Sequence, residues 1–380
     1  MSAYAIYRLP HEDHATLIRQ TEGEPVELLS LTELNGRQGF VVAPFEVTAQ
    51  QPILVIRPDE VERVLLEESG KRKEEREKRK EERDYQLGNN PPQEYSLTSH
   101  LIPEQSSPTR SLSPLTTKSH YAIDFANYHS QLENDTFRKI VLARCADEKL
   151  GENVEPMELF YRACSLYPRL FIALVETEKS GCWLTATPEI LLEGKGSDWR
   201  TIALAGTMKL EGDQLNGEGE TLRWSTKNIQ EQRIVATYIT ECLEQFTGDF
   251  REEGPRTVRA ANLVHLRSDF TFKFDSQDHL GELLNTLHPT PAVCGLPKRE
   301  AFQFIVKNEH TPRRYYSGFM GPLGDCETHL YVSLRCMNID GQNCHLFAGG
   351  GLLKDSTEEQ EWQETEAKLE TMRRILDIRT

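Results

Sequence analysis

The stretch EWQETEAKL, residues 361–369, places ionisable side chains beside the apolar face of a predicted helix near the end of the chain. At about 100° per residue, Glu361, Glu364 and Lys368 form one stripe along that helix. Two carboxylates at i, i+3 suit a hard divalent cation, especially if a third carboxylate comes from elsewhere. The alternative is an ordinary Glu364–Lys368 ion pair at i, i+4, worth about 0.2–0.5 kcal/mol. The neighbouring buried stripe contains Trp362, Thr365, Leu369, Met372 and Leu376.

The elements that must position these groups follow from the pattern of apolar residues. The last helix is predicted to begin near Asp355 or Ser356, because Ser356 and Glu359 have the spacing of a capping box. Other helices are predicted over residues 221–246, 278–288 and 297–309. Strands are predicted at runs such as GFVVAPFEV, PILVIRP, KIVLAR, RLFIALVE, GCWLTATP, EILLEG and WRTIALAG. Asp340-Gly341 is predicted as a hairpin turn. Hairpins mixed with helices, without a regular βαβ rhythm, indicate an α+β fold.

Composition excludes several classes of function. The 380 residues include 44 basic and 60 acidic side chains, a formal net charge of −16, which argues against non-specific nucleic-acid binding. No apolar run is long enough for a membrane span, and the first residues have no secretory pattern. The eight cysteines form no C-x-x-C pair, which favours free thiols in a reducing cytoplasm over a zinc site or disulfides.

The chain divides by character near residue 120. Residues 1–120 are predicted to be a β-rich segment with a charged and loop-like insertion near 70–120. Within it, residues 71–84 are fourteen consecutive charged residues of both signs, which indicates a solvated helix or linker more than a basic binding arm. Residues 121–380 carry the candidate chemistry, and the two parts are expected to form one compact domain. The sequence contains no Walker loop and no G-x-G-x-x-G.

A series of motifs links the candidate residues to a known superfamily. KIVLAR, TATPEILL, ALAGT, TKNIQEQ, LVHL, HPTPAVCGLPK, YYSGFMG, VSLRC, FAGGGL and EWQETEAKL occur in that order between about residues 121 and 378. This series resembles the chorismate-utilising enzymes, the superfamily of anthranilate synthase component I, and most closely the isochorismate synthases. The resemblance implies two layered antiparallel β-sheets flanked by helices, Mg²⁺ as cofactor and chorismate as substrate.

The resemblance also assigns the metal site. It implies that Glu231, Glu361 and Glu364 bind Mg²⁺ directly or through water, and that Lys368 binds a substrate carboxylate. The helix motif around Glu231 departs from the common K-D-R-x-E-H pattern, because Asn228 replaces an acidic residue and Gln232 replaces histidine. These two replacements put the outer metal shell in question.

Three further residues match catalytic positions of the family. Lys139 matches the general base that activates water, and Glu189 matches the general acid that protonates the leaving hydroxyl. Burial favours the uncharged form of each group, as both roles require. His265 matches a histidine near the departing or attacking oxygen. Without the resemblance, each would be interpreted as an ordinary strand or turn residue.

The remaining matches concern substrate binding. Arg335 matches the arginine that holds the enolpyruvyl carboxylate, for which a guanidinium offers two parallel hydrogen bonds. The other positions are Gly206, Thr207, Ala292, Tyr316, Gly350 and Gly351. Lys139 favours the water-using isochorismate and salicylate synthases over anthranilate synthase. Ala205 argues against aminodeoxychorismate synthases with a nucleophilic lysine there, and Ala292 favours isochorismate over salicylate synthase.

The resulting prediction is a cytoplasmic, Mg²⁺-dependent isochorismate synthase serving menaquinone or siderophore biosynthesis. The alternatives are a salicylate synthase, an anthranilate synthase component I and a non-catalytic relative. The predicted partner is the small molecule chorismate, with no nucleic acid and no membrane span, and the chain is expected to be a monomer or weak homodimer.

Overall fold

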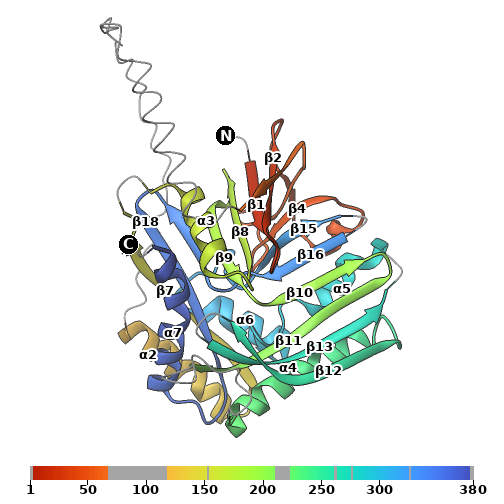
Figure 1. The fold of residues 1–380 in the computed structure, drawn as a ribbon. Coiled ribbons are helices and arrows are strands. Elements are labelled where there is room, and N and C mark those ends of the chain that lie inside the picture. The colour runs from red at the N-terminus through yellow and green to blue at the C-terminus, as the bar shows by residue number, and fades with distance from the viewer. Residues whose placement is uncertain are drawn as a thin grey trace, which may run out of the picture.

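The computed structural model describes residues 3–66, 118–151, 154–209, 223–260, 263–274, 277–324 and 327–376. Two nine-stranded antiparallel sheets pack against each other, with helices on their outer faces (Figure 1). The predicted α+β class with two layered antiparallel sheets flanked by helices is therefore confirmed. Among the described residues, no helix is long and apolar enough to cross a membrane. The charged run 71–84 lies outside the described residues.

The first sheet carries the strands that frame the candidate chemistry. Its spatial order is β14-β7-β18-β17-β9-β8-β1-β2-β6, and β18 pairs with β7 over ten residue pairs. β7 is buried on both faces along most of its length, which explains the uninterrupted apolar run IVLA. The strands are β1 Ala3–Arg8, β2 His14–Gln20, β6 Glu60–Leu65, β7 Lys139–Lys149, β8 Phe171–Thr177, β9 Gly181–Thr187, β14 Gly295–Leu296, β17 Cys336–Asp340 and β18 Asn343–Leu352.

The second sheet has the order β12-β13-β11-β10-β16-β15-β4-β5-β3. The strand runs predicted between residues 139 and 209 form β7 to β11, each near its predicted place. The strands of this sheet are β3 Val26–Leu28, β4 Gly39–Ala43, β5 Ile53–Ile56, β10 Ile190–Lys195, β11 Asp198–Lys209, β12 Phe250–Ala260, β13 Leu263–Lys273, β15 Phe319–Leu323 and β16 Glu327–Val332.

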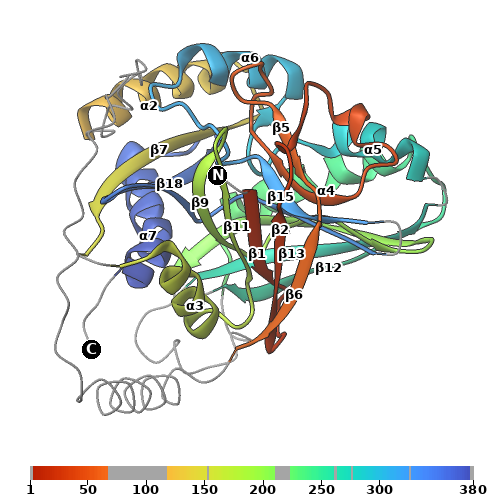
Figure 2. The same cartoon turned by 90° about the horizontal axis from the view of Figure 1, so that it is seen from above.

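The N-terminal strands are built into both sheets. β1 pairs with β8 of the first sheet, and β4 pairs with β15 of the second (Figure 1). Figure 2 shows β1, β2 and β6 side by side at the edge of the first sheet. Side chains of these strands, such as Ile18, Phe40 and Val42, join the apolar layer between the sheets. Residues 3–66 therefore share their core with the segment that carries the candidate chemistry.

Helices cover the sheets and bring charged residues to one end of the intersheet layer. Helices α4 and α5 pack on the second sheet, whereas α3 and α7 pack on the first. Helices α2 and α6 enclose a smaller apolar cluster beside β7. The α-helices are α2 Lys118–Glu133, α3 Pro156–Leu166, α4 Thr226–Leu243, α5 Leu280–Leu287, α6 Lys298–Asn308 and α7 Glu358–Leu376.

Two local predictions were wrong in detail. Helix α7 begins at Glu358, and the Ser356 hydroxyl accepts a hydrogen bond from Leu353 N at 3.0 Å while Glu359 pairs with Lys118, so the expected capping box does not form. In the β17–β18 hairpin, Asp340 pairs with Asn343 and only Gly341 has positive φ. The turn residues are therefore 341 and 342, one position later than predicted.

Candidate active site

A cavity lies beside β7, β10, β11 and β18, with about 640 Å³ of space that includes its opening to solvent. A larger depression of about 970 Å³ lies over β10 to β13, but none of the predicted site residues lines it. The smaller cavity is therefore the candidate site. The predicted residues in its walls are Glu189, Gly206, Thr207, Glu231, His265, Ala292, Tyr316, Arg335, Gly351 and Lys368.

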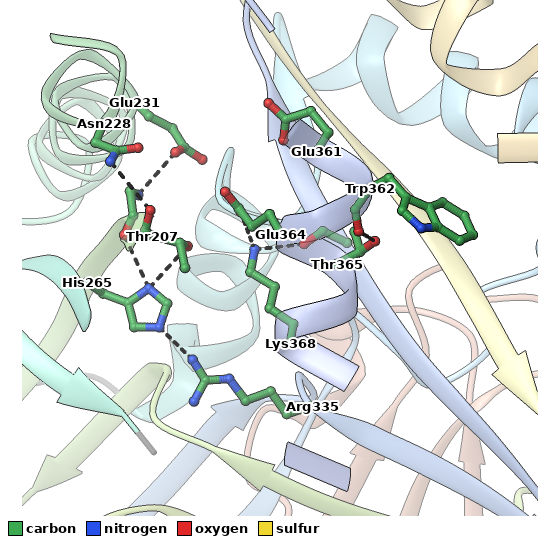
Figure 3. A network of polar contacts seen from close by, with 12 residues as sticks. Thr207, Asn228, Glu231, His265, Arg335, Glu361, Trp362, Glu364, Thr365 and Lys368 are labelled. Atoms are coloured by element: carbon green, nitrogen blue, oxygen red, sulfur yellow. Dashed lines mark hydrogen bonds and ion pairs between the residues drawn. The ribbon is translucent and has the colours of Figure 1, made fainter. Parts of the chain in front are cut away.

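The other predicted residues, Lys139, Gly350, Glu361 and Glu364, lie next to this wall. Glu231 of α4 and Glu361 and Glu364 of α7 point toward the same space between the two helices (Figure 3). A Cβ atom added to Gly350 would lie 3.0 Å from Glu361 Oε2 and 4.0 Å from Glu364 Oε1. A Cβ atom added to Gly351 would collide with Glu231 Oε1. The bare backbone of β18 therefore lets three carboxylates from two distant helices converge.

The electrostatics of this carboxylate cluster fit a divalent cation. Glu361 is 1% exposed, and burial together with the neighbouring Glu364 raises its pKa, which the Lys227 ammonium only partly offsets. Its Oε2 atom is buried and makes no hydrogen bond within the described residues. Burial opposes ionisation of Glu231 too, but the ion pair with Lys139 leaves the Glu231 pKa below its usual value. Because oxygen ligands suit hard cations, the cluster could hold Mg²⁺.

Lys139 lies at the start of β7, where its side chain is fully buried. Its Nζ is 2.9 Å from Glu231 Oε1, and it has no further hydrogen-bond partner among the described residues. A Cβ atom added to Gly351 would lie 2.8 Å from Lys139 Cε, so the glycine makes room for the lysine as well. The lysine thus points into the protein beside the cavity and not into bulk water.

Glu189 lies directly before β10 and is 4% exposed. Burial raises the pKa of its carboxyl to about 7, against the opposing charges of Lys139, Lys368 and Arg335. A substantial fraction of this side chain is therefore protonated near neutral pH, as expected of a general acid.

Arg335, between β16 and β17, is buried and has a φ of 47°, which is unusual for a side chain other than glycine. One of its guanidinium nitrogens lies 2.5 Å from His265 Nε2, and His265 Nδ1 lies 3.2 Å from Gly206 O (Figure 3). Burial and the Arg335 charge hold the pKa of His265 well below its usual value. The imidazole is therefore neutral, donating from Nδ1 and accepting at Nε2, and it holds Arg335 at the cavity wall.

Gly206 interrupts the pairing of β11 with β13 by a bulge between Ala205 and Thr207. Its φ is 74°, and a Cβ atom there would lie 2.9 Å from Asn228 O, so the close approach of α4 requires glycine. Gly206 N donates to Glu231 Oε2 at 3.1 Å. The bulge therefore positions both a cavity wall and a carboxylate of the cluster.

Lys368 Nζ donates to Glu364 Oε1 and to Gly349 O, each at 2.8 Å. The intrahelical ion pair considered from the sequence is thus present, and the same ammonium also lines the cavity. Tyr316, another residue of the cavity wall, is buried, and its ring stacks on Phe347.

The two motif departures have structural consequences. Gln232 is 1% exposed and donates to Ser268 Oγ at 2.9 Å, so it faces β13 and not the carboxylate cluster. Asn228 donates to Thr207 O at 3.4 Å and contributes no charge. The sequence analysis missed Lys227, which pairs with Glu361. Its spacing of four residues from Glu231 on one helix was the available signal.

The chain is similar in sequence to one protein family and to several named proteins. The family described as chorismate binding enzyme matches residues 64–377. Isochorismate synthase MenF of Escherichia coli is 31% identical over 242 residues, 63% of this chain and 56% of that protein. The salicylate biosynthesis isochorismate synthase of Pseudomonas aeruginosa is 32% identical over 253 residues, 65% of this chain and 52% of that protein.

The solved structure of E. coli MenF superimposes with a TM-score of 0.74 at 23% identity, covering 99% of this chain and 89% of that one. At 23% identity, this superposition shows a similarity of fold alone. The sequence matches span about half the length of the curated relatives. Since the family match covers most of the chain and includes every residue of the cavity and the carboxylate cluster, this chain belongs to the chorismate binding enzyme family.

Proposed function

We propose that this chain is an isochorismate synthase that interconverts chorismate and isochorismate with Mg²⁺. The observation that carries the proposal is the pair of buried groups, Lys139 and Glu189, beside a cavity bordered by the carboxylate cluster. Named isochorismate synthases among the relatives support the same activity.

The reaction moves a hydroxyl group from C4 to C2 of the ring, with a shift of a double bond. In the proposed mechanism, Lys139 takes a proton from the water that adds at C2, and Glu189 gives a proton to the C4 hydroxyl, which leaves as water. One water is consumed and one is released, so the reaction is an isomerisation. Because its pKa is raised, the Glu189 carboxyl can carry a proton near neutral pH and give it to the leaving oxygen.

Glu231, Glu361 and Glu364 would hold Mg²⁺, which would neutralise and orient the ring carboxylate. Lys139 can act as a base only in its neutral form, whereas its present neighbour is the Glu231 carboxylate. Sharing of the Glu231 charge with a cation would weaken that ion pair and release the amine for base catalysis.

Arg335 and Lys368 would bind the carboxylates of the substrate. Arg335 is buried, charged and fixed by His265, so a planar fork of donors is already in place for the enolpyruvyl carboxylate. In this proposal His265 positions the arginine, because both of its ring nitrogens are engaged. Ala292, Tyr316 and the backbone from 206 to 207 and 349 to 351 shape the cavity around the ring.

Product analysis tests the activity directly. Incubating the protein with chorismate and Mg²⁺ is expected to give an equilibrium mixture of chorismate and isochorismate, separated by chromatography. Salicylate with pyruvate, and no accumulating isochorismate, would instead show a salicylate synthase. Anthranilate formed in the presence of ammonium would show an anthranilate synthase, and no turnover at all would show a non-catalytic relative.

A cytoplasmic location and a monomer or weak homodimer are part of the same proposal. The seven described cysteines are all buried, and none is in a disulfide, which suits a reducing compartment. Whether the product enters menaquinone or siderophore biosynthesis would follow from the enzymes that accept it.

A further inference from the structure

Lys227 is a partly buried cation to which the proposed mechanism gives no role. It lies on α4, one helical turn before Glu231, so both side chains project from the same face of the helix. Its Nζ donates to Glu361 Oε1 of α7, and its side chain is 20% exposed. This contact joins the two helices that supply the carboxylate cluster.

Each carboxylate of the cluster has its own lysine. Glu231 pairs with Lys139 at 2.9 Å, Glu364 pairs with Lys368 at 2.8 Å, and Glu361 pairs with Lys227. Lys139 and Lys368 also face the cavity or its wall, where substrate chemistry can use them. Lys227 instead neutralises the most buried of the three carboxylates.

All three carboxylates of the cluster act electrostatically on Lys227. Burial acts to lower the pKa of its ammonium, yet Glu361, Glu364 and Glu231 together raise it above its usual value. Lys227 therefore responds to the same three negative charges that a divalent cation would use. One oxygen of Glu361 is engaged by Lys227, whereas the other is buried without a hydrogen bond in the described part of the chain.

We propose that Lys227 is a built-in competitor of the divalent cation: it holds Glu361 through an ion pair, keeps α4 and α7 together before the cation binds, and lowers the affinity of the cluster for that cation. The inference rests on the proposed metal site. It accounts for how three carboxylates converge in a largely buried place without a large repulsive cost. The cation must overcome both the positive charge of Lys227 and its hold on Glu361.

The opposite role is also physically possible, because residues that hydrogen-bond a metal ligand often orient it and strengthen metal binding. The two roles differ in sign. Removing a competitor tightens metal binding, whereas removing a positioning residue weakens it. Direct affinity measurements therefore separate them.

The test is calorimetric titration of the full chain with Mg²⁺ and, in parallel, with Mn²⁺ monitored by electron paramagnetic resonance, both without substrate. The variants are Lys227→Met and Lys227→Gln, of which the second keeps a hydrogen-bond donor but no charge. Each is expected to bind either ion at least about tenfold more tightly than the unmodified chain, since a nearby positive charge is removed. In metal-free buffer each is expected to unfold at a lower temperature.

The matched control is Lys118→Met. Lys118, on α2, forms an exposed ion pair with Glu359 of α7, the helix that also carries Glu361, and its loss should leave the affinity for the ion unchanged. Lys227→Arg, which retains the charge, should not bind the ions more tightly. Equal or weaker binding by both neutral variants would overturn the inference. If the unmodified chain itself binds neither ion, the proposed metal site fails instead, so the two failures are distinguishable.

Discussion

At the scale of single residues, the site contains buried ionisable groups whose surroundings differ. Lys139 lies beside the carboxylate of Glu231. The pKa of Glu189 is raised, because the effect of burial outweighs that of the positive charges around it. His265 is neutral because burial, together with the charge of the neighbouring Arg335, holds its pKa well below the usual value. Burial thus favours the uncharged forms of both Glu189 and His265, and an uncharged carboxyl is what a proton donor requires.

Replacing the proposed base tests the first of these environments. Lys139→Ala is expected to lower kcat by about 10²–10⁴-fold, because the proposed general base is removed. Circular dichroism and thermal unfolding should show that the fold is kept. Arg138→Ala, one residue earlier, is the control and should retain activity. Full activity in Lys139→Ala would remove the base assignment.

The pKa of Glu189 predicts a pH dependence. A general acid must be protonated, so kcat/KM for chorismate should fall as the pH rises through about 7. Below that pH the carboxyl is already protonated, so kcat/KM should no longer change with the protonation of Glu189. The profile should therefore have a plateau at low pH and a falling limb above about pH 7. Glu189→Gln should be strongly impaired, and its residual rate should lack the limb. A limb that persists unchanged in Glu189→Gln would assign it to another group.

At the scale of elements, β18 and the helices α4 and α7 form the site together. The glycines of β18 lie where the carboxylates converge. A buried arginine of β7, Arg144, contacts α7 and holds it in place. Its Nε donates to Thr365 Oγ1 at 2.7 Å, and its guanidinium lies 3.9 Å from the centre of the Trp362 ring. The helix that carries Glu361 and Glu364 is thus held by contacts of the neighbouring stripe, which contains Trp362 and Thr365.

A graded series of glycine substitutions tests the role of β18. Gly351→Ala should abolish activity and metal binding, since the new Cβ collides with Glu231 and lies 2.8 Å from Lys139 Cε. Gly350→Ala should be milder, because its Cβ would lie 3.0 Å from Glu361 Oε2. Gly248→Ala, with no atom within 4 Å, is the control. Equal activity across the series, measured with chorismate, would contradict the close packing described for β18.

Removing the arginine tests how α7 is held. Arg144→Met should lower the free energy of unfolding by about 2–3 kcal/mol, because a buried hydrogen bond to Thr365 and a partly buried ion pair with Glu366 are lost. It should also weaken Mg²⁺ binding by loosening Glu361 and Glu364. Arg373→Met, which removes a more exposed contact with the same Glu366, should cost no more than about 1 kcal/mol. Urea unfolding of the two variants gives the comparison, and equal losses would show that burial is not the cause.

At the scale of the whole molecule, the two sheets and their covering helices form one framework around the cavity. N-terminal strands complete both sheets, and the carboxylate cluster is shared between helices packed on different sheets. A cation bound there would connect α4 on the second sheet with α7 on the first. Metal binding should therefore increase the free energy of unfolding of the whole molecule.

Magnesium should therefore stabilise the folded protein. At 100 times its dissociation constant, a ligand that binds only the folded state adds about 2.7 kcal/mol to the free energy of unfolding. Thermal unfolding should shift upward with Mg²⁺ and return to the metal-free value after chelation with EDTA. Glu231→Gln should lose most of the shift, and an identical shift in that variant would place the stabilising ion elsewhere.

The sequence by itself determined the candidate site residues and much of the local structure. Motif order selected the candidate residues, the apolar runs predicted strands such as β7 and β10, and the spacing of Glu361, Glu364 and Lys368 placed them on one helical stripe. These features depend on residue type and on neighbours within a few positions, which the sequence displays directly.

Only the tertiary structure decided which distant groups meet. The Lys227–Glu361 contact joins residues 134 positions apart, and the pairing of β1 with β8 joins residues still farther apart, such as Tyr4 and Glu176. The bulge at Gly206, the neutral state of His265 and the missing capping box also depend on packing. Local propensity cannot predict such contacts, because their free energies arise from burial and charge that exist only once the sheets and helices have packed together.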